Sequence, residues 1–311
     1  MSRTKEDPKD YIELLSVDLL KDTRRRKLVE RWSKVLGREL GWHYILDLIW
    51  IVKQVEESGI PRDSVILDAG AGTGLSQFLL ASLGYNVLSV DYKSRNFPVR
   101  YRLVFRIKNR SDGNVADSSY IEHVSEKEAF DLRRTGDRLL GKWNKLMGMP
   151  LLTSEALKFE QKNRYGEVSL YQEDLKDLRS IPSNSVDCVV SVSAIEHNDF
   201  RGVGAVISEL GRVTKRGASM FITTSAAKGR DRFHEPAHGW CFSEATLARL
   251  FHLINPKSNF DRYDEFFADL VKNEYLRNNL SRFYLHSGKG GLPWGEWNPL
   301  YYPVGVVKYN R

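Results

Sequence analysis

A glycine-rich turn directly after a short apolar run is the feature that most constrains this chain. Val65-Ile66-Leu67 is followed by Asp68-Ala69-Gly70-Ala71-Gly72-Thr73-Gly74, and a helix is expected to begin near Leu75. Glycines are favoured there because a turn can need positive φ and because a bound ligand can come too close for a β-carbon. The spacing does not match the phosphate-binding Gly-x-x-x-x-Gly-Lys-Ser/Thr loop. The Asp68 carboxylate would repel a pyrophosphate and attract a cation, such as the ammonium of a methionine moiety.

Four further apolar runs predict an α/β fold. They show little alternation, as expected for strands that are buried on both faces, and helix-compatible stretches separate most of them. Strand and helix in repetition indicate a mostly parallel sheet covered by helices. The five runs are residues 65–67, 86–90, 167–171, 186–192 and 218–224.

Two more acidic positions follow strands in the same series. Asp91 ends the run 86–90, about 20 residues beyond the glycine turn, where an acid can accept hydrogen bonds from both ribose hydroxyls of an adenosine. Glu173-Asp174-Leu175 follows the run 167–171, where an acid can accept the exocyclic amine of adenine and an apolar side chain can pack on the ring. Together these positions favour an adenosine-containing ligand with a cationic end.

With these motifs the sequence resembles the class I S-adenosylmethionine-dependent methyltransferases over about residues 60 to 250. The resemblance includes Ser191-Val192-Ser193-Ala194-Ile195-Glu196-His197 and Leu210-Gly211-Arg212-Val213. It implies a Rossmann-like, seven-stranded, mostly parallel sheet sandwiched by helices, with an antiparallel last strand. S-adenosylmethionine is the implied cofactor and S-adenosylhomocysteine the product. The implied cofactor-binding residues are Asp68, Ala69, Gly70, Gly72, Thr73 and Gly74 for the methionine part, Asp91 and Tyr92 for ribose, Glu173, Asp174 and Leu175 for adenine, and Ser191 and Ser193 beside the sulfonium.

Three histidines are candidate proton acceptors. His197 follows the fourth strand, and His234 and His238 follow the fifth, so all three are expected in one crevice. Each of them can instead have a purely structural role. Relatives that bind a divalent ion use Glu-x-x-Glu-His plus a later histidine, but Ser193 replaces the first glutamate here. We therefore expect no metal, with Glu196, His197 and His238 as the alternative ligand set. Asp47, on an apolar helix, is interpreted as a structural residue.

The chain is divided by these patterns into several parts. Residues 1–58 are predicted to be a helical extension and 59–311 the methyltransferase domain, with 93–166 an inserted acceptor-recognition lobe and 255–311 the closing strands and loop. The lobe opens with a basic run, and its Tyr101-x-Leu103-x-Phe105-x-Ile107 alternation predicts a half-buried strand with packed aromatic rings. The basic residues are Lys93, Arg95, Arg100, Arg102, Arg106, Lys108 and Arg110.

The acceptor is predicted from weaker features. The basic run and the glycine- and tryptophan-rich segment 288–299 favour O-methylation of a hydroxyl on a small-molecule or carbohydrate acceptor that can be anionic. RNA or another nucleic acid is one alternative, and a non-catalytic cofactor-binding subunit is another. The net charge of +7 suits an anionic partner without locating one. The N-terminus lacks an apolar signal and no stretch is long enough to span a membrane, so we expect a cytoplasmic protein.

Overall fold

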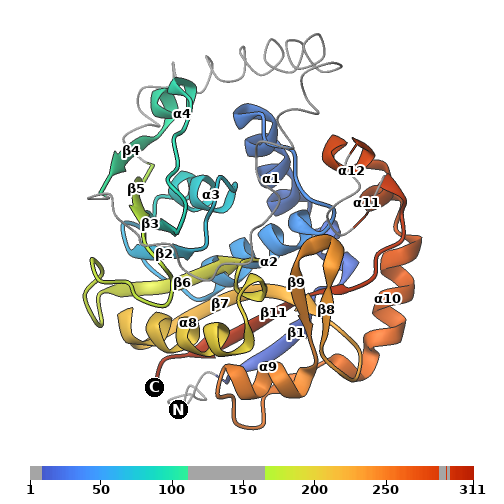
Figure 1. Ribbon diagram of the computed structural model, residues 1–311. Coiled ribbons are helices and arrows are strands. Elements are labelled where there is room, and N and C mark those ends of the chain that lie inside the picture. Colours follow the sequence, from blue (N-terminus) through green and yellow to red (C-terminus); the bar gives the residue numbers. More distant parts are fainter. Residues whose placement is uncertain (1–8, 111–164, 287–291, 293–294) are drawn as a thin grey trace, which may run out of the picture.

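The computed structural model describes residues 9–110, 165–286, 292 and 295–311, and these form one large sheet flanked by helices (Figure 1). The sheet has 11 strands, nine of them in the order β10-β1-β11-β7-β6-β2-β3-β5-β4, with the β8–β9 hairpin joined to the end of β7. The strands are β1 (Tyr11–Leu14), β2 (Val65–Ala69), β3 (Asn86–Asp91), β4 (Arg106–Asn109), β5 (Glu167–Gln172), β6 (Val186–Val192), β7 (Thr214–Ala226), β8 (Arg232–His234), β9 (Gly239–Phe242), β10 (Lys257–Ser258) and β11 (Tyr302–Tyr309).

Helices cover both faces of this sheet (Figure 1). Helix α2 packs on β6, β7 and β11, and α3 packs on β3 and β5, while α8 contacts β7 from the opposite face. None of the described helices combines the length and the apolar composition needed to cross a membrane. The α-helices are α1 (Thr23–Leu36), α2 (Tyr44–Glu57), α3 (Ser76–Ser82), α4 (Val99–Val104), α8 (Phe200–Val213), α9 (Glu244–Leu250), α10 (Tyr263–Lys272), α11 (Glu274–Asn278) and α12 (Arg282–His286).

The predicted mostly parallel sheet is confirmed. The five predicted strands β2, β3, β5, β6 and β7 pair in parallel, and β11 runs antiparallel to β7. The sheet is wider than the seven strands expected, because β1 and β10 extend it beyond β11 at one edge and the β8–β9 hairpin adds two strands at the end of β7. A single sheet thus joins the N-terminal segment, the start of the predicted lobe and the C-terminal strand.

Two local predictions are wrong in part. Tyr11–Leu14, expected to be helical, is a strand that alternates between half-buried and buried side chains and pairs with β11. The alternation at 101–107 is not one strand, because residues 99–104 form α4 and only Arg106–Asn109 is extended. The aromatic rings of Phe97, Tyr101 and Phe105 are nevertheless buried as predicted. Their spacing of four brings all three within 5.1 Å of the Phe78 ring, measured between centroids.

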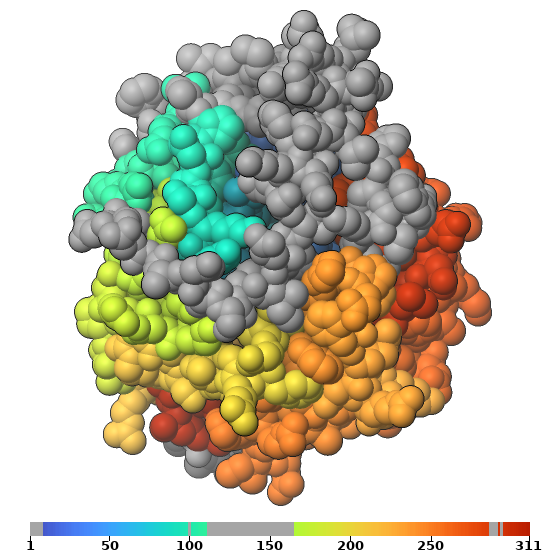
Figure 2. Space-filling model, viewed as in Figure 1, coloured from blue at the N-terminus to red at the C-terminus, as the bar shows by residue number. Residues whose placement is uncertain are grey.

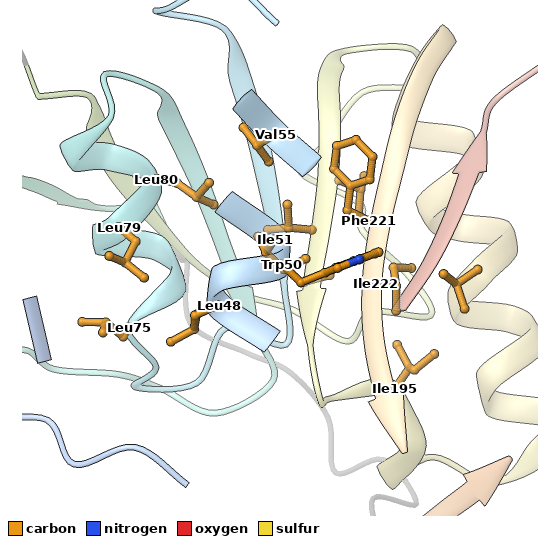
Figure 3. Close-up of a cluster of buried hydrophobic side chains, with 14 of the residues drawn as sticks. Leu48, Trp50, Ile51, Val55, Leu75, Leu79, Leu80, Ile195, Phe221 and Ile222 are labelled. Carbon is orange, nitrogen blue, oxygen red and sulfur yellow. The ribbon is translucent and has the colours of Figure 1, made fainter. Parts of the chain in front are cut away.

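The core lies between α2 and the sheet. Helix α2 is apolar around most of its surface, so it is buried on several sides (Figure 3). Its Trp50 side chain lies against Phe221 of β7, with ring centroids 6.5 Å apart, and its indole nitrogen donates to Glu13 of β1 at 2.7 Å. This packing fixes the N-terminal segment against the strands whose carboxyl ends carry the site.

Replacing Gly305 of β11 tests this packing. A β-carbon at Gly305 would lie 2.4 Å from the Trp50 ring, so Gly305→Ala should lower the free energy of unfolding by about 1 to 3 kcal/mol through overpacking. Gly204 in α8 has nothing within 4 Å of its added β-carbon, and Gly204→Ala should instead stabilise by about 0.5 to 1 kcal/mol. Urea unfolding gives the free energy of unfolding of each variant. Equal changes in that free energy for Gly305→Ala and Gly204→Ala would contradict the packing described.

Candidate functional site

The glycine turn is held in shape by the strands on either side of it. Gly70 and Gly72 have φ of +71° and +49°, and a β-carbon on Gly70 would lie 2.4 Å from the Ala194 β-carbon. The Gly72 amide donates to Asp91 Oδ2 at 2.8 Å, while Asp91 Oδ1 accepts the Lys93 amide at 2.9 Å. Each carboxylate oxygen can accept a second hydrogen bond. Asp91 therefore shapes the turn and keeps acceptor capacity for a ligand.

Asp68 is buried at the end of β2. Its Oδ2 accepts a hydrogen bond from Ser76 at 2.5 Å, and its Oδ1 has no hydrogen-bond partner among the described residues. Burial raises the pKa of Asp68 to about 6, against the lowering effects of the Ser76 hydroxyl and the Arg95 charge. A buried carboxylate oxygen without a partner is costly. An ammonium or a water bound beside it would satisfy this oxygen.

Arg95 hydrogen-bonds the glycine turn and the two strands next to it. The sequence did not predict this role. Its guanidinium donates to the carbonyl oxygens of Ser89 at 2.6 Å and Tyr171 at 2.9 Å, and to the Ser89 hydroxyl at 2.5 Å. Gln77 completes the network, since its amide donates to the Gly74 carbonyl at 3.0 Å and accepts the Ser89 hydroxyl at 2.7 Å. Arg95 belongs to the basic run that was expected to favour an anionic acceptor. The structure instead uses it to join β3, β5 and the glycine turn.

The segment after β5 lies beside Asp91. The Glu173 amide donates to the Asp91 carbonyl at 3.1 Å, and a β-carbon on Gly70 would lie 3.6 Å from the Leu175 side chain. Asp174 Oδ1 accepts the Lys176 amide at 2.9 Å, so part of this carboxylate is used in the local turn. Glu173 Oε2 is buried without a partner among the described residues. Both acids predicted to meet adenine therefore remain candidates.

The end of β6 closes the other side of the turn. The Ser191 hydroxyl donates to the Ala69 carbonyl at 2.8 Å and ties β6 to β2. Ser193 has φ of +45°, which is unusual for a residue other than glycine, and its amide donates to the Thr223 carbonyl at 3.0 Å. Ala194 then meets Gly70. Backbone strain of this kind is concentrated at functional sites.

Glu196 and His197 lie next to the β8–β9 hairpin, which carries His234 and His238 at its turn. Glu196 is buried and accepts the Thr224 hydroxyl at 3.0 Å, and burial raises its pKa to about 8. His197 Nδ1 lies 3.0 Å from the His238 carbonyl oxygen, and burial lowers the pKa of His197 to about 4. His234 is also buried, and its pKa is lowered to about 4. Burial is the larger cause and the nearby Arg232 charge the smaller one. Near neutral pH this group is uncharged at Glu196, His197 and His234.

The β8–β9 hairpin brings the later histidines to the earlier pair. A β-carbon on Gly239 would lie 3.2 Å from the His197 ring and 3.3 Å from Glu196 Cγ, so a larger residue here would push against both side chains. On the face shown in Figure 2, the yellow chain near residue 200 adjoins the orange chain near residue 235. Among the described residues, no three histidine, cysteine or acidic side chains are grouped as metal ligands.

A buried His43–Asp47 pair borders the same region. His43 Nδ1 lies 2.6 Å from Asp47 Oδ2, and Asp47 Oδ1 has no partner among the described residues. The Tyr301 ring lies between this pair and the histidine group formed by His197, His234 and His238. The Tyr301 ring centroid is 5.5 Å from the His43 ring centroid and 5.2 Å from the His234 ring centroid. From its sequence context, Asp47 was interpreted as a structural residue. Its i, i+4 spacing from His43 was the one available signal of the pair.

The predicted cofactor residues thus lie along one edge of the sheet. They stand at the carboxyl ends of β2, β3, β5 and β6, which are adjacent in the order β6-β2-β3-β5. Open α/β sheets bind ligands in the crevice at this edge. The unpartnered Asp68 oxygen and the narrow glycine turn fit a ligand with a cationic end.

Residues 149–222 match the family model of a methyltransferase domain, and this match covers β5, β6, α8 and most of β7. Over these residues the chain is similar to a methyltransferase domain. No curated protein sequence matches the chain.

Solved structures with a similar fold are distant in sequence. The [4+2]-cyclase SpnF aligns with 12% identity and a TM-score of 0.47 over 97% of this chain and 99% of its own. A 1,6-didemethyltoxoflavin-N1-methyltransferase from Burkholderia thailandensis aligns with 14% identity and a TM-score of 0.40 over 94% and 82%. A protein of echinomycin biosynthesis aligns with 18% identity and a TM-score of 0.31 over 57% of this chain, which spans only 48% of that protein. Such distances transfer no substrate to this chain.

Asp91 is predicted to be the main polar anchor of the cofactor. Asp91→Ala removes the partner of the Gly72 amide and the acceptor for ribose, and hydrogen bonds to charged groups contribute about 1.5 to 3 kcal/mol each. We expect the dissociation constant of S-adenosylhomocysteine to rise at least about tenfold in calorimetric titration. Asp177→Ala, at an acid paired with Arg179 beyond β5, is the matched control and should bind normally. Wild-type affinity in Asp91→Ala would contradict the ribose assignment.

Glu196 should make the stability of the protein depend on pH. Its folded pKa of about 8 lies above the ordinary 4.5, so the stability it provides in acid is lost as pH rises through 8. Between pH 6 and pH 9 this loss is about 2 to 3 kcal/mol. Glu196→Gln removes the ionisable group, so urea unfolding should show a smaller decline for the variant over this interval. Parallel declines in the two proteins would show that Glu196 is already ionised at pH 6.

Proposed function

We propose that the enzyme methylates a hydroxyl group of a small-molecule or carbohydrate acceptor. The observation that carries this proposal is the group Glu196, His197 and His234 beside the glycine turn, which is uncharged near neutral pH. A neutral hydroxyl can enter such a site without bringing a second buried charge, which would be costly. When bound, S-adenosylmethionine supplies an activated methyl group at its sulfonium.

In this proposal His197 accepts the proton of the acceptor hydroxyl. Its Nδ1 is positioned to donate to the His238 carbonyl, and a second hydrogen bond with the Ser193 backbone helps to hold the ring in place. The lowered pKa keeps the ring unprotonated at pH 7, as a proton acceptor must be, and also makes it a weaker base than an ordinary histidine. His238 orients His197 through its backbone, and His234 lines the same region.

The basic run supports a small acceptor rather than a polyanion. Arg102 and Arg106 donate to the carbonyl oxygens of Ile107 and Tyr165, and Lys108 and Arg110 both pair with Glu167. With Arg95 held behind the glycine turn, most of the described cations in this run are already bound to groups of the chain itself. To contact the phosphates of a nucleic acid, these side chains would have to give up bonds within the chain.

Transfer of a radiolabelled methyl group tests the proposed function. The protein would be incubated with tritiated S-adenosylmethionine and with separate small-molecule and RNA fractions of a cell extract. We expect label in the small-molecule fraction, in a product that is stable to mild alkali as a methyl ether is. Label confined to RNA would contradict the acceptor class. Tight binding of S-adenosylhomocysteine with no labelled product would indicate a non-catalytic subunit.

Two histidine variants separate the base from its orienting group. His197→Gln should lower the rate of label transfer about a hundredfold or more, the scale of general-base catalysis, and should leave S-adenosylhomocysteine affinity unchanged. His238→Asn keeps the carbonyl that holds His197 and tolerates the φ of +46° found there, so it should retain most of the activity. Loss of activity in His238→Asn with full activity in His197→Gln would reverse the two roles.

A further inference from the structure

A pocket of about 350 Å³ lies between β8, α10 and the end of β7, away from the glycine turn. In Figure 1 the β8–β9 hairpin and α10 stand beside each other to the right of the sheet. Small residues leave room in the pocket, and aromatic and charged side chains line the rest. The lining residues are Ala227, Lys228, Arg232, Tyr263, Asp264, Phe267, Ala268 and Leu300.

The charges of this pocket are unbalanced. Lys228 forms an ion pair with Asp264, so these two charges compensate each other. Arg232 is half-buried, and no carboxylate of the described residues forms an ion pair with it. A half-buried guanidinium without a carboxylate partner is a strong site for a carboxylate or phosphate, because it offers planar, charge-assisted hydrogen bonds.

One wall of the pocket is aromatic. The rings of Tyr263 and Phe267 lie nearly parallel, with centroids 5.9 Å apart and an interplanar angle of 12°. The Tyr263 hydroxyl contacts the Ala226 carbonyl at 3.4 Å, which attaches this wall to the end of β7. Flat apolar surfaces of this kind pack well against the C–H faces of a ring-shaped ligand.

The pocket is connected to the proposed methyl-transfer site through β8. Arg232 and His234 are two residues apart on this strand, so their side chains project from the same face about 7 Å apart. Their electrostatic interaction is consistent with this distance, since the Arg232 charge adds to burial in lowering the pKa of His234. One molecule the size of a monosaccharide could reach both residues.

We propose that this pocket binds the anionic group of the acceptor, a carboxylate or phosphate on a sugar-like ring, with Arg232 as its partner. The ring would lie against Tyr263 and Phe267, and its hydroxyl would point along β8 toward His234 and the histidine group. This inference rests on the proposed function and narrows the acceptor to anionic monosaccharide-like compounds. It places the acceptor's charge on β8 rather than on the basic run.

Calorimetric titration with defined probes tests the pocket. The full chain, saturated with S-adenosylhomocysteine, would be titrated with glucuronate, glucose 6-phosphate, glucose and inorganic phosphate. We expect the two anionic sugars to bind at least about tenfold more tightly than glucose or phosphate, since only they engage both the cation and the aromatic wall. Binding of phosphate as tightly as the sugars would assign the pocket to a free anion and overturn the acceptor assignment.

Variants locate the binding. Arg232→Gln should weaken both anionic sugars at least about tenfold, Arg232→Lys should weaken them less, and Phe267→Ala should weaken the sugars but not phosphate. Arg249→Gln, at an exposed arginine of α9, is the charge-matched control. Unchanged S-adenosylhomocysteine affinity in each variant shows that it is folded.

The two proposals fail in different ways. A wild-type protein that binds S-adenosylhomocysteine but neither anionic sugar would overturn the pocket assignment alone, as would wild-type sugar binding by Arg232→Gln. A wild-type protein that binds the anionic sugars and methylates no small-molecule fraction would overturn the proposed function, and the pocket would then be an anion site unrelated to methyl transfer.

Discussion

The hydrogen bond between the Gly72 amide and the Asp91 carboxylate organises the cofactor edge of the sheet. It joins the turn after β2 to the end of β3 and fixes a backbone shape that requires positive φ at two glycines. Neighbouring groups depend on that shape: Ala194 fits against Gly70, and Arg95 reaches carbonyl oxygens of β3 and β5 from behind. Arg95 also donates to the Gly72 carbonyl of the turn, at 3.3 Å.

Burial determines the charge of the groups around this edge. Glu196 and Asp68 are carboxyl groups whose pKa values are raised because water is excluded from them, and His197 and His234 have lowered values for the same reason. Near pH 7 Glu196, His197 and His234 are therefore uncharged, Asp68 is mostly ionised, and the pocket on β8 carries the cation Arg232. In the proposed arrangement, Arg232 binds the anionic end of the acceptor, and the acceptor hydroxyl reacts beside the uncharged Glu196, His197 and His234.

Much of the sheet and most of the cofactor edge could be predicted from the sequence, because buried parallel strands and a glycine turn leave strong local patterns. Tyr11–Leu14 was mistaken for helix because four residues contain too little periodicity, and its partner β11 is almost 300 residues away. Arg95 was interpreted as part of the basic run because nothing local reveals that its acceptors are backbone carbonyls of two other strands. The place of the His43–Asp47 pair beside His234 was missed because the Tyr301 ring, which contacts both His43 and His234, comes from a distant part of the chain. Most of the predicted lobe, residues 111–164, and most of residues 287–294 lie outside the described residues, so these predictions stay open.

The most direct measurement is a crystal structure of the protein grown with S-adenosylhomocysteine. The account predicts electron density for the nucleoside at the carboxyl ends of β2 and β3, with the ribose hydroxyls on Asp91 and the amino group next to Asp68, directly or through one water. An empty crevice at saturating ligand would contradict the account. So would a ligand bound elsewhere, with the Asp91 carboxylate contacting only the Gly72 and Lys93 amides.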